Sequence, residues 1–139
     1  MLGVGTLDDA LALCPALQGP YEALWGAVQA EVPPRLRILC AHLVAELLGA
    51  LVPPPSADDP ALPRGARAAP VWRDAAALSA AERAVLGFAE HFVLDPHTVT
   101  DADLAALGAH FAPPTIVALT ELVALLDGAT RLRLALGVS

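Results

Sequence analysis

The stretch Leu78-Ser-Ala-Ala-Glu-Arg-Ala-Val-Leu-Gly-Phe-Ala-Glu90 decides the fold of this chain. Ser79 and Glu82 have the spacing of a capping box, in which each side chain accepts a hydrogen bond from a free backbone N–H at the start of a helix. The apolar residues behind this box recur with helical spacing. We therefore expect an amphipathic helix that runs to about Leu94. Its apolar face consists of Val85, Phe88 and Phe92.

Two further helices are expected on the C-terminal side. Thr100-Asp-Ala-Asp103 is a weaker capping box, because Asp stands where Glu or Gln is usual, and it predicts a helix to His110. Pro113-Pro114 favours the start of a last helix, which runs to Leu136 with Gly137 as its C-cap. Apolar residues on two sides of this helix predict burial on two sides. The two stripes are Ile116, Leu119, Val123 and Leu126, and Leu122, Leu125, Ala129, Leu132 and Leu136.

Prolines divide the N-terminal part of the chain. Thr6 followed by Asp8-Asp9 predicts a short capped helix towards Leu13. Pro15 and Gly19-Pro20 are expected to interrupt it. A second helix is predicted over residues 21–29.

A third helix is predicted from Pro34 to Leu51, with Pro53-Pro54-Pro55 as its stop. Residues 52–77 are rich in Pro, Ala and Asp, and we interpret them as a mobile loop. The apolar face of the third helix consists of Leu36, Leu39, Cys40, Leu43, Leu47 and Leu51.

The composition favours a single all-α domain over residues 1–139. Hydrophobic residues make up 56% of the chain and aromatic residues only 4%, so the apolar content is mostly Ala, Leu and Val. Ala and Leu are strong helix formers, and no segment alternates with the period of a β-strand.

The charge and the cysteines exclude several classes of function. A net charge of −7 argues against binding to nucleic acid or to anionic membranes. No apolar run is long enough to cross a bilayer, and the N-terminus lacks a basic signal-peptide region. Cys14 and Cys40 are isolated and fit no metal or redox spacing. The sequence gives no support for a disulfide between them. We expect a cytoplasmic protein with free thiols.

Three segments, residues 78–90, 95–104 and 131–138, closely resemble the C-terminal half of the carboxymuconolactone decarboxylase superfamily, which includes the alkylhydroperoxidase D-like proteins. The resemblance reaches upstream to about Pro33. It implies an all-α, alkylhydroperoxidase D-like helical bundle. It also implies a homo-oligomer that packs through its long apolar helices, and we expect the two-striped last helix to form the interface.

The reactive positions of the superfamily are replaced in this chain. Pro34-Arg-Leu-Arg-Ile-Leu39 matches a family segment of the form Pro-x-Arg-Leu-Arg-Glu-Leu, but Ile38 stands at the Glu. Gly49 matches the Gly before the family's cysteine pair, whereas Ala50 and Pro53 occupy the two cysteine positions. The nearby His is also missing. The resemblance therefore implies that the family's thiol peroxidase mechanism cannot run here.

Other residues could supply chemistry in place of the lost ones. His42 and Glu46 share a helix face at i,i+4 and could act as an acid–base pair. Glu90 and His91 form a second candidate pair, and Cys40 is the remaining candidate thiol. No metal site and no cofactor are predicted.

Three hypotheses about function remain. The favoured one is a degenerate, non-catalytic protein, or pseudoenzyme, that acts in binding or assembly and has an apolar pocket for a small molecule. The second is an enzyme with a rebuilt acid–base site, of decarboxylase or lyase type, that acts on a small organic acid or lactone. The third is a residual peroxidase that uses Cys40 alone. If a pocket exists, we expect His42 or His91 to be its polar contact.

Overall fold

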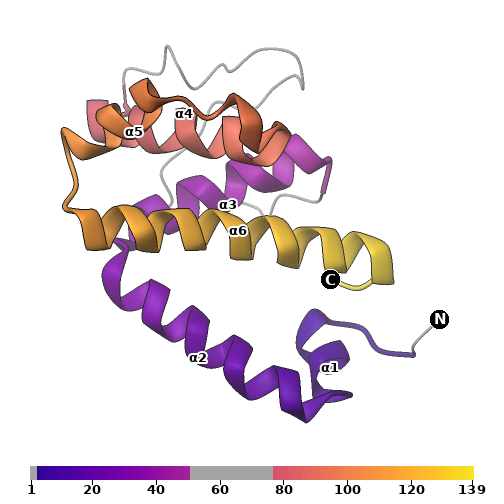
Figure 1. Ribbon diagram of the computed structural model, residues 1–139. Helices are drawn as coiled ribbons and strands as arrows, with labels where there is room; N and C mark the ends of the chain where they lie inside the picture. The colour runs from indigo at the N-terminus through magenta and orange to yellow at the C-terminus, as the bar shows by residue number, and fades with distance from the viewer. Residues whose placement is uncertain (1–2, 51–76) are drawn as a thin grey trace.

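A computed structural model describes residues 3–50 and 77–139, and every regular element within them is a helix (Figure 1). The all-α prediction is therefore confirmed for this part of the chain. The predicted loop over residues 52–77 lies, except for Ala77, outside the described residues. The elements are α1 (Leu7–Ala12), α2 (Pro15–Glu31), α3 (Pro34–Leu48), α4 (Ala80–Leu94), a 3₁₀ turn η2 (Pro96–Thr98), α5 (Asp101–Gly108) and α6 (Pro113–Leu136).

Helix α6 is the centre of the fold. Figure 1 shows it between α3, α4 and α5 on one side and α2 on the other, and it packs against all of them. The apolar side chains of α3, α4 and α6 are buried against one another, and such burial is the main favourable term in folding. Within the described residues, no helix is long and apolar enough to cross a membrane. The fully buried side chains include Leu39, Val44, Val85, Leu86, Leu107, Leu119, Leu122 and Val123.

The capping box predicted at Ser79 is formed and is linked to α3. The backbone N–H of Glu82 donates to Ser79 Oγ at 3.1 Å, and the N–H of Ser79 donates to Glu82 Oε2 at 2.8 Å. The Nε of Arg35 pairs with the other oxygen of Glu82, and its Nη2 donates to the carbonyl of Ala77 at 3.3 Å. This contact between residues 47 positions apart holds the starts of α3 and α4 together.

The prediction of a break before Tyr21 is wrong. Helix α2 begins at Pro15 and continues through Pro20 to Glu31. A proline at the first helical position costs nothing, because its missing N–H would have no partner in the helix. Pro20 removes one further hydrogen bond, and the residue before it, Gly19, has no Cβ to clash with the proline ring. The helix can therefore continue past Pro20.

The predicted end of the third helix at Leu51 is also wrong. Helix α3 ends at Leu48, and Gly49 follows it in the left-handed conformation with φ +68°. The N–H of Ala50 then donates to the carbonyl of Ala45 at 2.8 Å, as in a Schellman motif. Gly49 is thus a helix cap in this chain. It ends the helix before the proline run is reached.

The last helix has the predicted bounds and the predicted left-handed C-cap at Gly137. The burial of its apolar side chains varies along the helix. Leu119 and Leu122 are fully buried and Leu125 packs against the core, but Leu132 is 42% exposed. The core therefore covers the first turns of α6 and leaves apolar side chains in its last turns uncovered.

Candidate functional site

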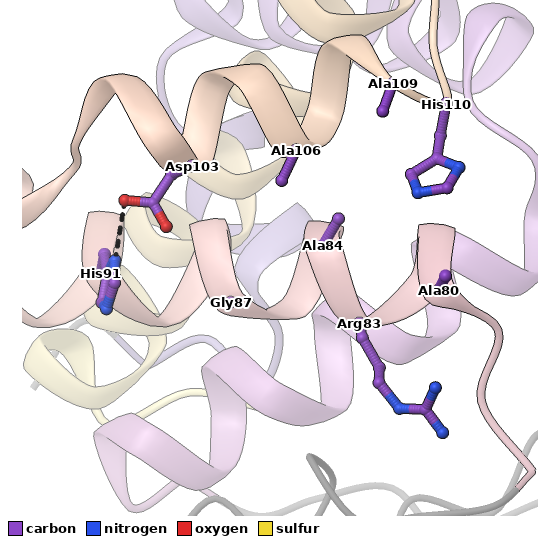
Figure 2. Close-up of a pocket in the computed structure, with 9 residues that line it drawn as sticks. All are labelled: Ala80, Arg83, Ala84, Gly87, His91, Asp103, Ala106, Ala109 and His110. Carbon is purple, nitrogen blue, oxygen red and sulfur yellow. Dashed lines mark hydrogen bonds and ion pairs between the residues drawn. The ribbon is translucent and has the colours of Figure 1, made fainter.

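A groove of about 540 Å³ runs between α4 and α5 (Figure 2). Along α4 it is lined by small residues that recur every three or four positions, so one face of this helix leaves space towards α5. Figure 2 shows His91 and Asp103 together at one end and His110 at the other, while the side chain of Arg83 extends away from α5. The lining residues are Ala80, Arg83, Ala84, Gly87, His91, Asp103, Ala106, Ala109 and His110.

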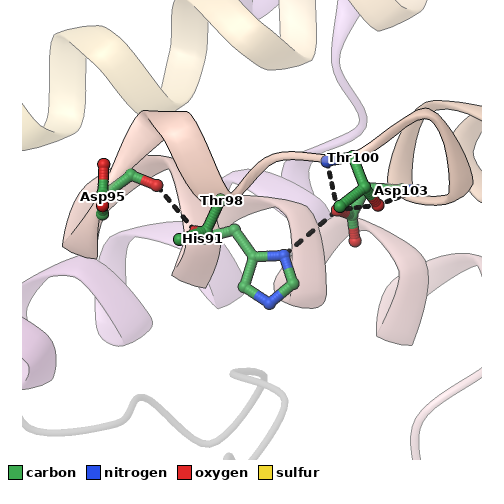
Figure 3. A network of polar contacts seen from close by, with 5 residues as sticks. All are labelled: His91, Asp95, Thr98, Thr100 and Asp103. Carbon is green, nitrogen blue, oxygen red and sulfur yellow. Dashed lines mark hydrogen bonds and ion pairs between the residues drawn. The ribbon is translucent and has the colours of Figure 1, made fainter.

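The turn between the two helices brings His91 and Asp103 together. The carboxylate of Asp95 caps this turn by accepting a hydrogen bond from the N–H of His97 at 3.0 Å. The hydroxyl of Thr98 donates to the carbonyl of Asp95 at 2.7 Å (Figure 3). The chain thus folds back after α4, so that the start of α5 lies beside the end of α4.

Asp103 holds the imidazole of His91 in place. His91 Nδ1 lies 3.1 Å from Asp103 Oδ2, which also accepts from the N–H and the hydroxyl of Thr100, each at 2.8 Å (Figure 3). Burial acts to raise the pKa of Asp103. The hydrogen bonds from Thr100 and His91 outweigh that effect and lower the pKa below its usual value. The carboxylate is therefore ionised at neutral pH and orients the ring.

The pair has the geometry of an oriented general base. A histidine held by a carboxylate can transfer protons at neutral pH. The described lining of the groove includes no Ser, Thr or Cys. The arrangement is suited to hydrogen bonding or to proton transfer.

The other predicted acid–base residues lie elsewhere. His42 and Glu46 are half-buried on α3, are not joined by a hydrogen bond in the described structure, and do not line this groove. Glu90 is half-buried beside His91 but is not part of the lining. Over residues 3–50 and 77–139, no three potential metal ligands gather in one place. Of the five candidates, only His91 belongs to the groove.

Cys40 is in the hydrophobic core. Its side chain is fully buried on α3, and this burial raises the pKa of the thiol to about 12. A neutral, enclosed thiol is a poor nucleophile. Cys14 is exposed at the N-cap of α2, and both cysteines are free, so they form no disulfide with each other.

We expect only Cys14 to react with a thiol reagent such as DTNB in the native protein at pH 8. In denaturant both cysteines should react, because the barrier at Cys40 is burial in the fold. Absorbance of the released thionitrobenzoate measures the number of reactive thiols. The matched control is Cys14→Ser, which should leave the native protein unreactive. Rapid labelling of this variant would mean that Cys40 is accessible.

Sequence reasoning missed Asp103 and His110 as groove residues. Asp103 was recognised only as part of a capping box, because its second contact is with a side chain 12 positions earlier. A helix followed by a short Pro-containing turn and a second helix indicates that the end of the first helix lies near the start of the second. This pattern is the signal in the sequence that points to the His91–Asp103 pair. Comparison of the chain with family models, with curated proteins and with solved structures gives no match.

Proposed function

We propose that this chain is a non-catalytic protein of the alkylhydroperoxidase D-like fold, related to the carboxymuconolactone decarboxylase superfamily, and that it works by self-assembly and ligand binding. The motifs behind the resemblance support this proposal because they coincide with structural features. Ser79 and Thr100 cap α4 and α5, and Gly137 ends α6. Ile38 and Ala50, in contrast, replace groups that perform the family's chemistry.

The environments of the candidate catalytic residues argue against catalytic activity. A thiol with the burial and pKa of Cys40 cannot serve as a peroxidatic nucleophile. His42 and Glu46 make no hydrogen bond to each other or to His91 in the described structure. The groove with His91 has an oriented base, and its described lining residues include no Ser, Thr or Cys.

The observation that carries the assembly role is the exposure of α2. This helix has 17 residues, and Val28 is the only one of them that is fully buried. A helix of this length draws most of its stability from tertiary packing. One fully buried residue supplies little of that stability. Leu17 and Leu24 on α2 are 60% and 40% exposed, and Leu134 in the last turns of α6 is 51% exposed. We propose that a second copy of the chain covers these side chains.

We expect the wild-type protein to be a homo-oligomer, and Leu24→Glu and Leu134→Glu to weaken its association by about 30-fold or more. The reason is that a charged side chain at the centre of an apolar interface costs at least about 2 kcal/mol. Light scattering over a range of protein concentrations measures the effect.

The matched control for this test is Leu104→Glu. Leu104 is 46% exposed on α5, away from α2, and its replacement should leave the association unchanged. Leu125 is a poor test position because it packs against the core. A wild-type protein that is monomeric at micromolar concentration would contradict the assembly role.

One observation favours a second candidate function. The His91–Asp103 pair could transfer protons in a rebuilt site that acts on a small organic acid or lactone. Turnover of such a compound that is lost in His91→Gln would assign the chain to this function instead. We place the protein in the cytoplasm, where the exposed thiol of Cys14 would remain reduced.

A further inference from the structure

A second groove, of about 370 Å³, lies where α2, α3 and α6 meet. Its walls are mostly apolar and include the indole of Trp25 on α2 and the side chains of Leu122 and Leu126 on α6. Arg37 and Gln29 are the polar residues among those that line it, and none of the lining residues is acidic. The volume falls in the range of small-molecule sites, which is about 300 to 1,000 Å³.

Arg37 is the cation among the residues that line this groove. Its Nε is shielded from solvent and has no hydrogen-bond partner in the described part of the chain. Arg35, two positions earlier on α3, is in contrast paired with Glu82. A shielded N–H donor without a partner is costly, so an anionic acceptor that reaches the Nε of Arg37 would lower the free energy of the protein.

We propose that this groove binds a small organic monocarboxylate with an apolar body. The guanidinium of Arg37 would pair with the carboxylate, because its planar N–H groups match two carboxylate oxygens. The side-chain amide of Gln29 provides a further hydrogen-bond donor. Trp25 and the α6 leucines would cover the apolar body. A single cation beside apolar walls suits one negative charge, whereas a phosphate dianion would call for further cations. This inference rests on the ligand-binding half of the proposed function.

The emission of Trp25 gives a direct test. The chain has two tryptophans, so Trp72→Phe leaves Trp25 as the only indole reporter in the groove. Titration of this protein with hexanoate should change the emission of Trp25 in a saturable way. Hexanamide, which has the same body and no charge, should bind about 10-fold or more weakly, as expected for loss of a charge-assisted hydrogen bond.

Variants at Arg37 identify the cation. In Arg37→Gln the preference for hexanoate over hexanamide should disappear, and in Arg37→Lys it should be partly retained. The matched control is Arg133→Gln, which removes an exposed arginine from α6 and should leave the titration unchanged. Thermal unfolding of each variant checks that the fold is intact.

Three results would overturn the proposal. They are the absence of a saturable response to hexanoate in the Trp72→Phe protein, equal binding of hexanoate and hexanamide, and an acid preference that survives in Arg37→Gln. If Arg37→Gln dissociates the oligomer while hexanoate has no effect, the partner of Arg37 is an acidic side chain of a second copy. If the protein is a monomer and still binds hexanoate through Arg37, the assembly role fails and this inference stands.

Discussion

Replacing Leu119 with Ala should lower the free energy of unfolding by about 3 kcal/mol, within the usual range of about 2 to 5 kcal/mol for a buried leucine. Leu119 is 0% exposed and lies on α6, the helix on which the other helices pack. The loss combines the transfer free energy of the removed methyl groups with the cost of the cavity they leave. Urea denaturation followed by circular dichroism measures the change.

The same helix offers a matched control at Val117. Its side chain is 69% exposed, so Val117→Ala should change the free energy of unfolding by no more than about 0.5 kcal/mol. Ala is also the better helix former, which favours a small gain in stability. Equal losses at Leu119 and Val117 would contradict the orientation of α6 described here.

Replacing Asp103 with Ala should cost about 1 to 2 kcal/mol of unfolding free energy. The variant loses the side chain that accepts from the N–H and the hydroxyl of Thr100 at the start of α5, a term of about 1 kcal/mol for a helix cap. It also loses the pair with His91, which is partly exposed and contributes at most about 1 kcal/mol. Chemical denaturation of the variant measures the sum.

Asp101→Ala is the matched control for this substitution. Asp101 is exposed in the first turn of the same helix, so its removal affects mainly the interaction with the helix dipole. We expect a loss of about 0.5 kcal/mol. In addition, removal of His91 should cost less in the Asp103→Ala background than in the wild type. Strictly additive effects of the two substitutions would show that the two side chains do not interact.

The lowered pKa of Asp103 predicts that the stability of the protein depends on pH. For Asp103 and Glu82, burial acts to raise the pKa, but hydrogen bonds and the charge of a neighbouring side chain, His91 or Arg35, lower it below the usual value. Their contribution is complete above the pKa of the unfolded chain, which is about 3.9 for Asp and 4.3 for Glu, and is lost as the pH falls through the lower folded pKa. Asp103→Asn should therefore lose less stability than the wild type between pH 5 and pH 3, as urea midpoints will show.

The starts of three helices and the end of the last were predictable from the sequence. The boxes at Thr6, Ser79 and Thr100 each combine a hydroxyl with an acidic side chain, and each forms both of its hydrogen bonds. These bonds join residues three positions apart, so no distant part of the chain is needed to form them. Gly137 was predictable for the same reason, since a left-handed C-cap is a local requirement.

Prolines were a less reliable guide to helix boundaries than caps. Pro20 was expected to break α2 and does not, because a proline near a helix start removes few hydrogen bonds. The run that begins at Pro53 was expected to end α3, but Gly49 ends it first. Both corrections follow from the backbone conformation that each residue requires.

The sequence by itself determined the helical class and the capped helix starts, because composition and short-range hydrogen bonds are properties of the chain alone. The tertiary structure decided which charged groups meet. It paired Arg35 with Glu82, left the Nε of Arg37 without a described hydrogen-bond partner, and enclosed Cys40 so that its pKa rises to about 12. The reason is physical: the side-chain pairing and the desolvation depend on how distant helices pack, and helical periodicity fixes only the face that a residue occupies.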